Sequence, residues 1–290
     1  MSATPLTWGG RSIPAPGGLP AVAVSLTGPS LAQARTQARS AVDAGADVLE
    51  LRVDLLEETG AVAAPDPLDA ATAAAQVLEC LRGLGEIIAA DGADAGAGAP
   101  LLLTCRTAAE GGRARLDDTA YAALLHSILD GLADWAPERR PAAIDVEVQR
   151  GCLPQVCAQA HGLGVDVVAS FHDFEATPPD EVLEEVLARM ASEGADLAKI
   201  AVWPTSADDV ARLLGVCARA TAGTGEGAGP GVPVAAMSMG SLGAVSRVAP
   251  AFGTALTFAV VPDEQGEARA SAPGQMPIQD VRRCLELLRA

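Results

Sequence analysis

The chain has 290 residues, of which 49% are hydrophobic and 20% are charged, and its formal net charge at neutral pH is −17. This composition is that of a globular protein with enough apolar residues for one barrel-sized domain or two smaller ones. The negative charge argues against nucleic acid or an anionic membrane as a partner of the whole surface, and no apolar run approaches the roughly 20 residues of a membrane span.

Short apolar segments of β-forming residues alternate with longer segments of helical periodicity. The helical segments include 31–45, which ends in Gly45, and 179–194, which opens with proline and acidic residues and ends in Gly194. Eight strands are predicted, in chain order at 21–27 (AVAVSLT), 47–56 (DVLELRVDLL), 100–107 (PLLLTCRT), 142–148 (AAIDVEV), 165–171 (VDVVASF), 196–202 (DLAKIAV), 232–239 (VPVAAMSM) and 255–261 (ALTFAVV).

Eight βα repeats in a chain of this length predict an α/β protein, a (β/α)₈ TIM barrel, as a single domain over residues 1–290. A doubly wound open sheet is the alternative fold. Residues 1–20, rich in glycine and proline, are expected to form an N-terminal extension that closes the bottom of the barrel. The six cysteines show no CxxC or zinc spacing and the first residues lack a secretory signal pattern, which indicates a reduced, cytoplasmic protein.

Side chains alternate along a strand, so every second residue of a barrel strand faces inward. Applied to each strand, this alternation predicts an inward set of Glu50, Arg52, Asp54, Thr104, Arg106, Ser170, His172 and Lys199. These residues lie near the carboxyl ends of their strands, where (β/α)₈ enzymes carry their active sites. Asp145 and Glu147 lie somewhat earlier in their strand and either fill the barrel interior or support the ligand-binding residues.

Lys199 is the only lysine of the chain, which otherwise carries nineteen arginines, and it lies in a short apolar strand. Arginine stays protonated in proteins, whereas an amine in an apolar, positively charged pocket loses its proton readily and becomes a nucleophile. Such an amine can form a Schiff base with a carbonyl substrate. The alternative is that one lysine persists by chance in an arginine-rich composition.

Six motifs occur in the order and at the spacing of one known family: ELRVD (50–54), TCRTAAEGG (104–112), SFHDFEATP (170–178), DLAKIAV (196–202), MGSLGAVSR (239–247) and SAPGQ (271–275). In these motifs, which span nearly the whole chain, the sequence resembles type I 3-dehydroquinate dehydratase. The resemblance implies a (β/α)₈ barrel that uses no cofactor or metal and commonly forms a homodimer. It also implies a lyase of the shikimate pathway, which converts 3-dehydroquinate to 3-dehydroshikimate by syn elimination through a lysine imine.

The resemblance also assigns roles to residues of this chain. Lys199 is similar to the imine-forming lysine, His172 to the general acid and base, and Glu110 to the carboxylate that orients the histidine. Arg247 is similar to the residue that binds the substrate carboxylate. The other implied substrate-binding residues are Glu50, Arg52 and Arg106 for hydroxyl binding and charge balance, Ser271 and Gln275 in the last βα loop, Met239 and Phe258 in an apolar wall, and Ser25 in the first strand.

Three other functions are compatible with parts of the pattern. A class I aldolase or transaldolase also carries a lone lysine on the sixth strand, although His172 and the SAPGQ motif favour a dehydratase. A metal-dependent barrel enzyme would use Glu50, Asp54 and His172 as ligands. A binding protein without catalysis is the third, and it is disfavoured because each reactive position is filled.

The segment between the last strand and the SAPGQ motif is polar, acidic and longer than the connector usual in the family. We expect residues 263–270 to be weakly ordered without ligand, and ligand to order Ser271 to Gln275 over the site. Closure of such a loop excludes water from an imine, which water would otherwise hydrolyse.

Overall fold

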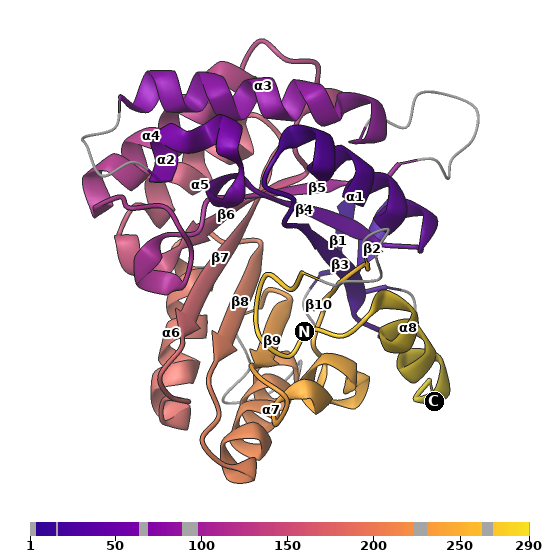
Figure 1. Cartoon of the computed structure of the whole chain (residues 1–290). Coiled ribbons are helices and arrows are strands. Elements are labelled where there is room, and N and C mark those ends of the chain that lie inside the picture. Colours follow the sequence, from indigo (N-terminus) through magenta and orange to yellow (C-terminus); the bar gives the residue numbers. More distant parts are fainter. Residues whose placement is uncertain are drawn as a thin grey trace.

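The computed structural model describes residues 4–15, 17–63, 69–88, 98–222, 231–262 and 269–289. Eight parallel strands in the order β10-β3-β4-β5-β6-β7-β8-β9 form a nearly closed barrel with helices around it (Figure 1), which confirms the predicted (β/α)₈ fold. Next to the first and last strands of that order, β10 and β9, the Ala255 amide donates to the Val234 carbonyl at 2.7 Å, so the two strands approach each other there. The barrel strands are β3 (Ala21–Leu26), β4 (Val48–Arg52), β5 (Leu101–Thr104), β6 (Ala143–Glu147), β7 (Asp166–Asp173), β8 (Leu197–Val202), β9 (Val234–Ser238) and β10 (Leu256–Ala259).

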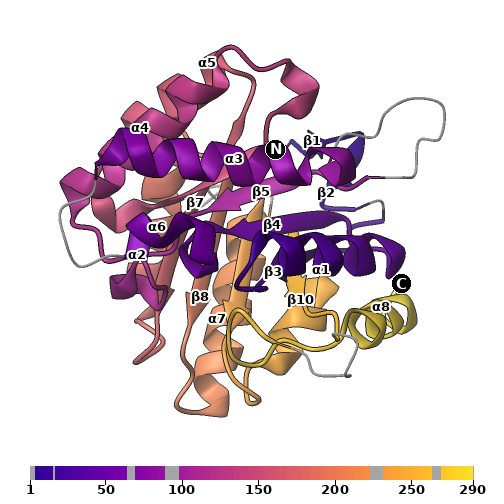
Figure 2. The same ribbon diagram turned by 45° about the horizontal axis from the view of Figure 1, so that its top comes forward.

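Helices cover the outside of the barrel between successive strands. Figure 2, with the top of the molecule turned forward, shows α3 and α4 packed along one side, and α1 and α8, the first and last helices, near each other on another. No helix in the described part of the chain is long and apolar enough to cross a membrane. The helices are α1 (Leu31–Asp43), α2 (Gly60–Ala63), α3 (Ala70–Ile88), α4 (Asp118–Leu132), α5 (Leu153–Gly162), α6 (Asp180–Ser192), α7 (Ala207–Thr221) and α8 (Ile278–Leu287).

Local sequence explains where the helices begin and end. Ser30 caps α1 by accepting the Gln33 amide, and Gln33 reaches back to the Ser30 amide. Ser206 and Asp209 form the same reciprocal cap on α7. The glycines expected to end two helices, Gly45 and Gly194, have φ of +86° and +102°, a backbone region that side chains disfavour.

The core has two layers, divided by the alternation of the strands. Leu49, Leu51 and Val53 pack outward against the helices, as does Cys105. The inward layer at the amino-terminal ends of the strands includes Trp8, Ile13, Val48, Leu102, Val168, Leu197 and Leu256. The chemistry-bearing side chains therefore lie at the opposite ends of the strands.

Two short antiparallel strands precede the barrel, β1 (Leu6–Trp8) and β2 (Arg11–Ile13). Trp8 and Ile13 are buried in the inward layer, and the Trp8 indole donates to the Asp166 carboxylate at 2.8 Å, where β7 begins. Sequence periodicity alone did not predict this hairpin, because three-residue strands are too short to show an alternation.

The second barrel strand is shorter than predicted. It ends at Arg52, and Val53–Leu55 form a 3₁₀ turn instead. Both Asp54 oxygens accept from the Arg52 guanidinium at 2.8 Å, and the backbone amides of Arg106 and Arg113 also donate to this carboxylate. These four hydrogen bonds stabilise the turn, so the alternation on which the inward position of Asp54 was predicted does not extend this far.

Candidate active site

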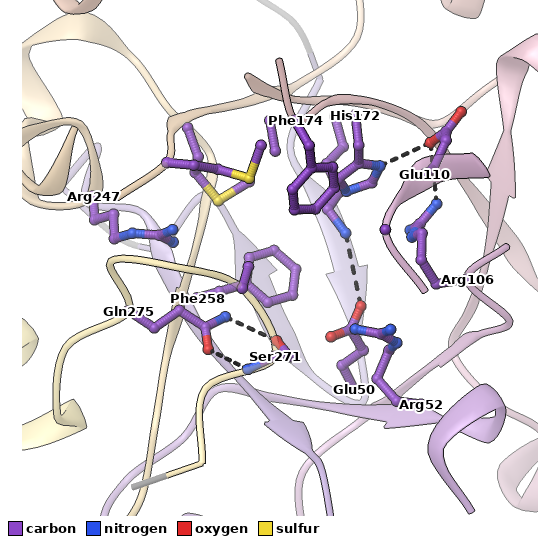
Figure 3. Close-up of a pocket in the computed structure, with 16 residues that line it drawn as sticks. Glu50, Arg52, Arg106, Glu110, His172, Phe174, Arg247, Phe258, Ser271 and Gln275 are labelled. Carbon is purple, nitrogen blue, oxygen red and sulfur yellow. Dashed lines mark hydrogen bonds and ion pairs between the residues drawn. The ribbon is translucent and has the colours of Figure 1, made fainter. Parts of the chain in front are cut away.

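A pocket at the carboxyl ends of the strands is lined by side chains from most of the barrel (Figure 3). Every predicted site residue lines it except Ser25. Its lining residues are Glu50, Arg52, Arg106, Glu110, Gly111, His172, Phe174, Lys199, Ala201, Met237, Met239, Arg247, Phe258, Ser271, Ala272 and Gln275.

Lys199 projects into this pocket from β8 and is only 5% exposed. Its Nζ lies 3.4 Å from Asp145 Oδ2, 3.7 Å from Glu50 Oε1 and 4.6 Å from the centre of the Phe258 ring. The prediction of a positively charged surrounding was wrong for its immediate neighbours, because the two charged groups that contact the amine are carboxylates.

His172 and Glu110 form a hydrogen-bonded pair beside the lysine. His172 Nδ1 lies 2.8 Å from Glu110 Oε2, and the residues that the structure describes supply no hydrogen-bond partner for Nε2. Burial, together with the positive charges of Arg106, Lys199 and Arg52, lowers the pKa of His172 well below 6.5. Burial, reinforced by Glu147 and Asp145 against the opposing charge of Arg106, raises the pKa of Glu110 to about 8. At neutral pH the imidazole is therefore neutral, and the proton that titrates near pH 8 is on the Glu110 carboxyl.

The turn that carries Glu110 is held by backbone contacts. Ala108–Glu110 form a 3₁₀ turn that ends at Gly111, whose φ is +80°. The Gly112 amide donates to the Thr107 carbonyl at 2.8 Å. A Cβ on Gly112 would lie only 2.1 Å from the Arg106 carbonyl oxygen, so the chain needs glycine here.

Two of the three predicted binding arginines are already paired with carboxylates of the protein. Arg52 binds Asp54, as described above. Arg106 donates to Asp145 Oδ1 at 2.7 Å, to Glu147 Oε1 at 3.1 Å and to Ser170 Oγ at 2.8 Å. These contacts fit the predicted charge-balancing role better than a role in binding an anionic ligand.

Arg247 differs from the other two arginines. It lies in a 3₁₀ segment, Ala244–Val248, is 1% exposed, and forms no ion pair with any carboxylate in the described ranges. Its Nη2 donates to the Pro273 carbonyl at 3.0 Å, whereas its Nε is buried without a partner. Burial lowers the pKa of Arg247 to about 10, so the guanidinium is still charged at neutral pH. The pocket wall thus contains a buried cation without a counter-ion in this part of the chain.

The loop after β10 closes the pocket. The Ser271 amide donates to Gln275 Oε1, and Gln275 Nε2 donates to Ser271 Oγ, both at 2.9 Å. Ser271 Oγ in turn donates to Ser25 Oγ at 2.8 Å, and Ser25 hydrogen-bonds to the Glu50 carboxylate. Ser25, predicted to bind substrate, does not line the pocket but lies behind Glu50 and Ser271.

The closed pocket is small. It encloses about 40 Å³, which is room for a few water molecules but not for a substituted six-membered ring. A cavity of about 280 Å³ adjoins it, and Arg52, Gly111 and Ser271 line both. A ring-sized ligand in the pocket would extend into this adjoining cavity or displace the loop. The segment predicted to be weakly ordered, 263–270, lies outside the described residues except for Arg269 and Ala270.

Alternation finds three of the five pocket residues that sequence reasoning missed, and the other two, Gly111 and Ala272, directly follow assigned residues. Phe174, Ala201 and Met237 each lie two residues from a residue assigned to the site or to its wall, on the same face of the chain. The metal-binding alternative placed Asp54 in the site, but Asp54 is bound to Arg52 and does not line the pocket. Within the described ranges, no three His, Cys, Asp or Glu side chains are grouped to hold a metal ion.

A parallel barrel with ionisable side chains gathered at the carboxyl ends of its strands is the architecture of a (β/α)₈ enzyme. Residues 22–290 match the family model described as type I 3-dehydroquinase. The chain belongs to the type I 3-dehydroquinase family, and the prediction of an enzyme of this family is confirmed.

Named relatives and solved structures agree with this family. The chain is 35% identical to a 3-dehydroquinate dehydratase of Klebsiella pneumoniae over 271 residues, 92% of each chain, and 36% identical to that of Lactiplantibacillus plantarum over 276 residues, 93% of each. The dehydratase structure of Geobacillus kaustophilus matches with a TM-score of 0.79 at 28% identity, over 99% of this chain and 97% of that one. A type I dehydratase of Clostridium difficile, carrying covalently modified comenic acid, matches equally well over 99% and 98% of the two chains.

Proposed function

We propose that the pocket dehydrates 3-dehydroquinate to 3-dehydroshikimate, a step of the shikimate pathway, through a cationic imine on Lys199. The observation that carries the proposal is a buried amine in one pocket with a neutral histidine and an uncompensated guanidinium. A β-hydroxy ketone that bears a carboxylate needs these three groups.

Lys199 supplies an electron sink. Its Nζ attacks the ketone carbon, the C=N bond forms, and the ketone oxygen leaves as water. A cationic imine acidifies the neighbouring C–H bond far more than a ketone does. The elimination can then run at neutral pH, and hydrolysis of the imine releases the product and restores the amine.

His172 performs the proton transfers. In its ionised form the Glu110 carboxylate accepts from Nδ1–H, which leaves the lone pair of Nε2 to remove the proton from carbon 2. The same nitrogen then delivers that proton to the departing hydroxyl, which leaves as water, so proton and hydroxyl depart from one face in a syn elimination. The lowered pKa of His172 keeps the ring in its basic form when substrate binds.

Arg247 binds the substrate carboxylate. A guanidinium presents two parallel N–H donors that match the two oxygens of a carboxylate. An anionic ligand would also satisfy the buried Nε of Arg247, which lacks a partner within the described ranges. Ser271, Gln275 and Glu50 then bind ring hydroxyls, while Met239 and Phe258 form the apolar wall.

Enone absorbance after addition of 3-dehydroquinate tests the reaction, and borohydride reduction with product tests the imine. We expect one reduced adduct on Lys199, since the only other amine of the chain is its α-amino group. Lys199→Arg should stay folded and be inactive, because the charge remains but the nucleophile is lost. His172→Ala should still form the adduct while turnover falls by about two orders of magnitude or more.

Turnover without any adduct on Lys199 would contradict the imine. A retro-aldol cleavage product in place of the enone would favour the aldolase alternative.

A further inference from the structure

Asp145 lies directly behind the lysine nitrogen. It belongs to β6, is 0% exposed and does not line the pocket. Its Oδ2 is nevertheless only 3.4 Å from Lys199 Nζ. Asp145 thus contacts the atom on which the proposed imine forms without itself lining the pocket.

The two oxygens of this carboxylate have separate partners. Oδ1 accepts from Arg106 Nη2 and from Ser170 Oγ, each at 2.7 Å. For Oδ2, the hydrogen-bond partner in the described part of the chain is Lys199. Because Ser170 on β7 is paired in register with Lys199 on β8, the strands themselves fix the position of the carboxylate relative to the amine.

Asp145 remains ionised in this interior. Burial opposes the charged form, but the charges of Arg106 and Lys199 and the hydrogen bond from Ser170 outweigh it, so the pKa of Asp145 is lowered. Glu50, the other carboxylate near the amine, is farther away at 3.7 Å, lines the pocket and also accepts from Thr104 Oγ1 at 3.0 Å. Glu50 is therefore available to the ligand, whereas Asp145 Oδ2 accepts from the lysine nitrogen from outside the pocket lining.

We propose that Asp145 is a further catalytic residue, the counter-ion that holds the cationic imine nitrogen of Lys199. The inference rests on the imine mechanism proposed above. The nitrogen gains a positive charge when the iminium forms, and a carboxylate already fixed beside it stabilises that cation without rearrangement. Glu50 can then hydrogen-bond to substrate while the iminium keeps its counter-ion.

Asp145→Asn tests this role, because the amide keeps the volume and removes the charge. With product and a brief borohydride exposure, we expect the fraction of chains reduced at Lys199 to fall at least tenfold from the wild-type value. Glu147→Gln is the matched control: Glu147 is also 0% exposed and bonded to Arg106, but it has no contact with Lys199 among those described. We expect this control to keep the wild-type adduct yield.

Equal yields in Asp145→Asn and wild type would overturn the counter-ion role and leave the imine intact. An equal loss of adduct in the two variants would mean that the effect comes from the altered pairing of Arg106, and it would also overturn the counter-ion role. A wild type that forms no adduct would overturn the imine and this inference together.

A second measurement uses the unaltered protein in case Asp145→Asn does not fold. Because Lys199 is the only lysine, ¹⁵N-lysine labelling gives a single side-chain nitrogen signal. With product bound, hydrogen bonding to a carboxylate should move the iminium ¹⁵N signal away from that of a model iminium salt with a non-coordinating anion. A signal that coincides with the model salt would overturn the proposal.

Discussion

Arg247 is both the proposed binding residue for the substrate carboxylate and a buried charge that destabilises the ligand-free fold. A buried charge without a counter-ion costs free energy, and a ligand carboxylate would remove that cost. Arg247→Met should therefore raise KM for 3-dehydroquinate about a hundredfold or more while kcat changes little. The same variant should unfold at an equal or higher temperature, since the uncompensated charge is gone.

Steady-state kinetics and thermal unfolding check both parts of this prediction. Arg212→Met is the control, because Arg212 is paired with Asp180 and Asp209 on the outer helices. That substitution should leave KM unchanged and lower the melting temperature slightly. An Arg247→Met variant with normal KM would remove Arg247 from substrate binding.

The raised pKa of Glu110 makes the stability of the folded protein depend on pH, and the direction of the shift determines whether stability rises or falls with pH. Its pKa is about 8 in the folded protein and 4.5 ordinarily, so between these values the unfolded chain has released a proton that the folded chain still holds. The contribution of Glu110 to stability is complete below about pH 4.5 and is lost as pH rises towards 8. Glu110→Gln, which cannot ionise, should gain stability relative to wild type across this window.

Urea unfolding of both proteins at pH 5, 6.5 and 8 measures that difference. We expect it to grow with pH and to become constant above about pH 8. A difference that stays the same at all three values would mean that the folded-state pKa of Glu110 is not raised.

Sequence alternation predicted single residues well wherever a strand continues. The outward positions of Leu51 and Cys105, and the inward positions of Lys199 and His172, follow from a period of two. It failed at Asp54 because a salt bridge and two backbone amides end the strand, and such long-range contacts leave no periodic signal. Asp145 was left ambiguous for the same reason, since its distance from Lys199 depends on the register between strands.

At the scale of elements, eight strands and their order follow from the pattern of apolar segments, within a few residues at each end. The turns between strand and helix were less predictable. The 3₁₀ segments that carry Glu110 and Arg247 have no apolar period, and only the family motifs placed those two residues in the site. Sequence periodicity thus gave the barrel, whereas the geometry of the loops depends on contacts between them.

The turn 107–112 is one element whose geometry can be tested directly. In Gly112→Ala the new Cβ would overlap the Arg106 carbonyl oxygen, a backbone atom that no side-chain rotation can move. We expect a loss of roughly 3 kcal/mol in unfolding free energy, together with at least a tenfold loss in turnover, because Glu110 is displaced from His172.

Gly85→Ala is the matched control for this prediction. Gly85 lies in α3 with open space around its Cα, so alanine should stabilise the helix by about 0.5–1 kcal/mol. Chemical denaturation and an activity assay of the two variants separate the effects. Normal activity in a stable Gly112→Ala would show that the turn tolerates the displacement.

Over the whole molecule, charge is divided between surface and interior. The surface carries much of a net charge of −17, whereas most of the arginines and carboxylates at the pocket are paired with one another, leaving Arg247 as the one buried cation described without a carboxylate partner. The proposed binding of an anionic substrate therefore depends on this one local group and not on attraction by the protein as a whole. The homodimer and the cytoplasmic location implied by the motifs stay predictions.

The single lysine also limits how this protein reacts with electrophilic metabolites. Sugars and acyl phosphates glycate or acylate proteins by reacting with exposed lysine amines. This chain has no exposed lysine, because its one lysine is 95% covered behind the closed loop. The outer surface is thus inert to lysine-directed chemical damage. A lysine adduct on this protein would record a molecule small enough to have passed through the pocket.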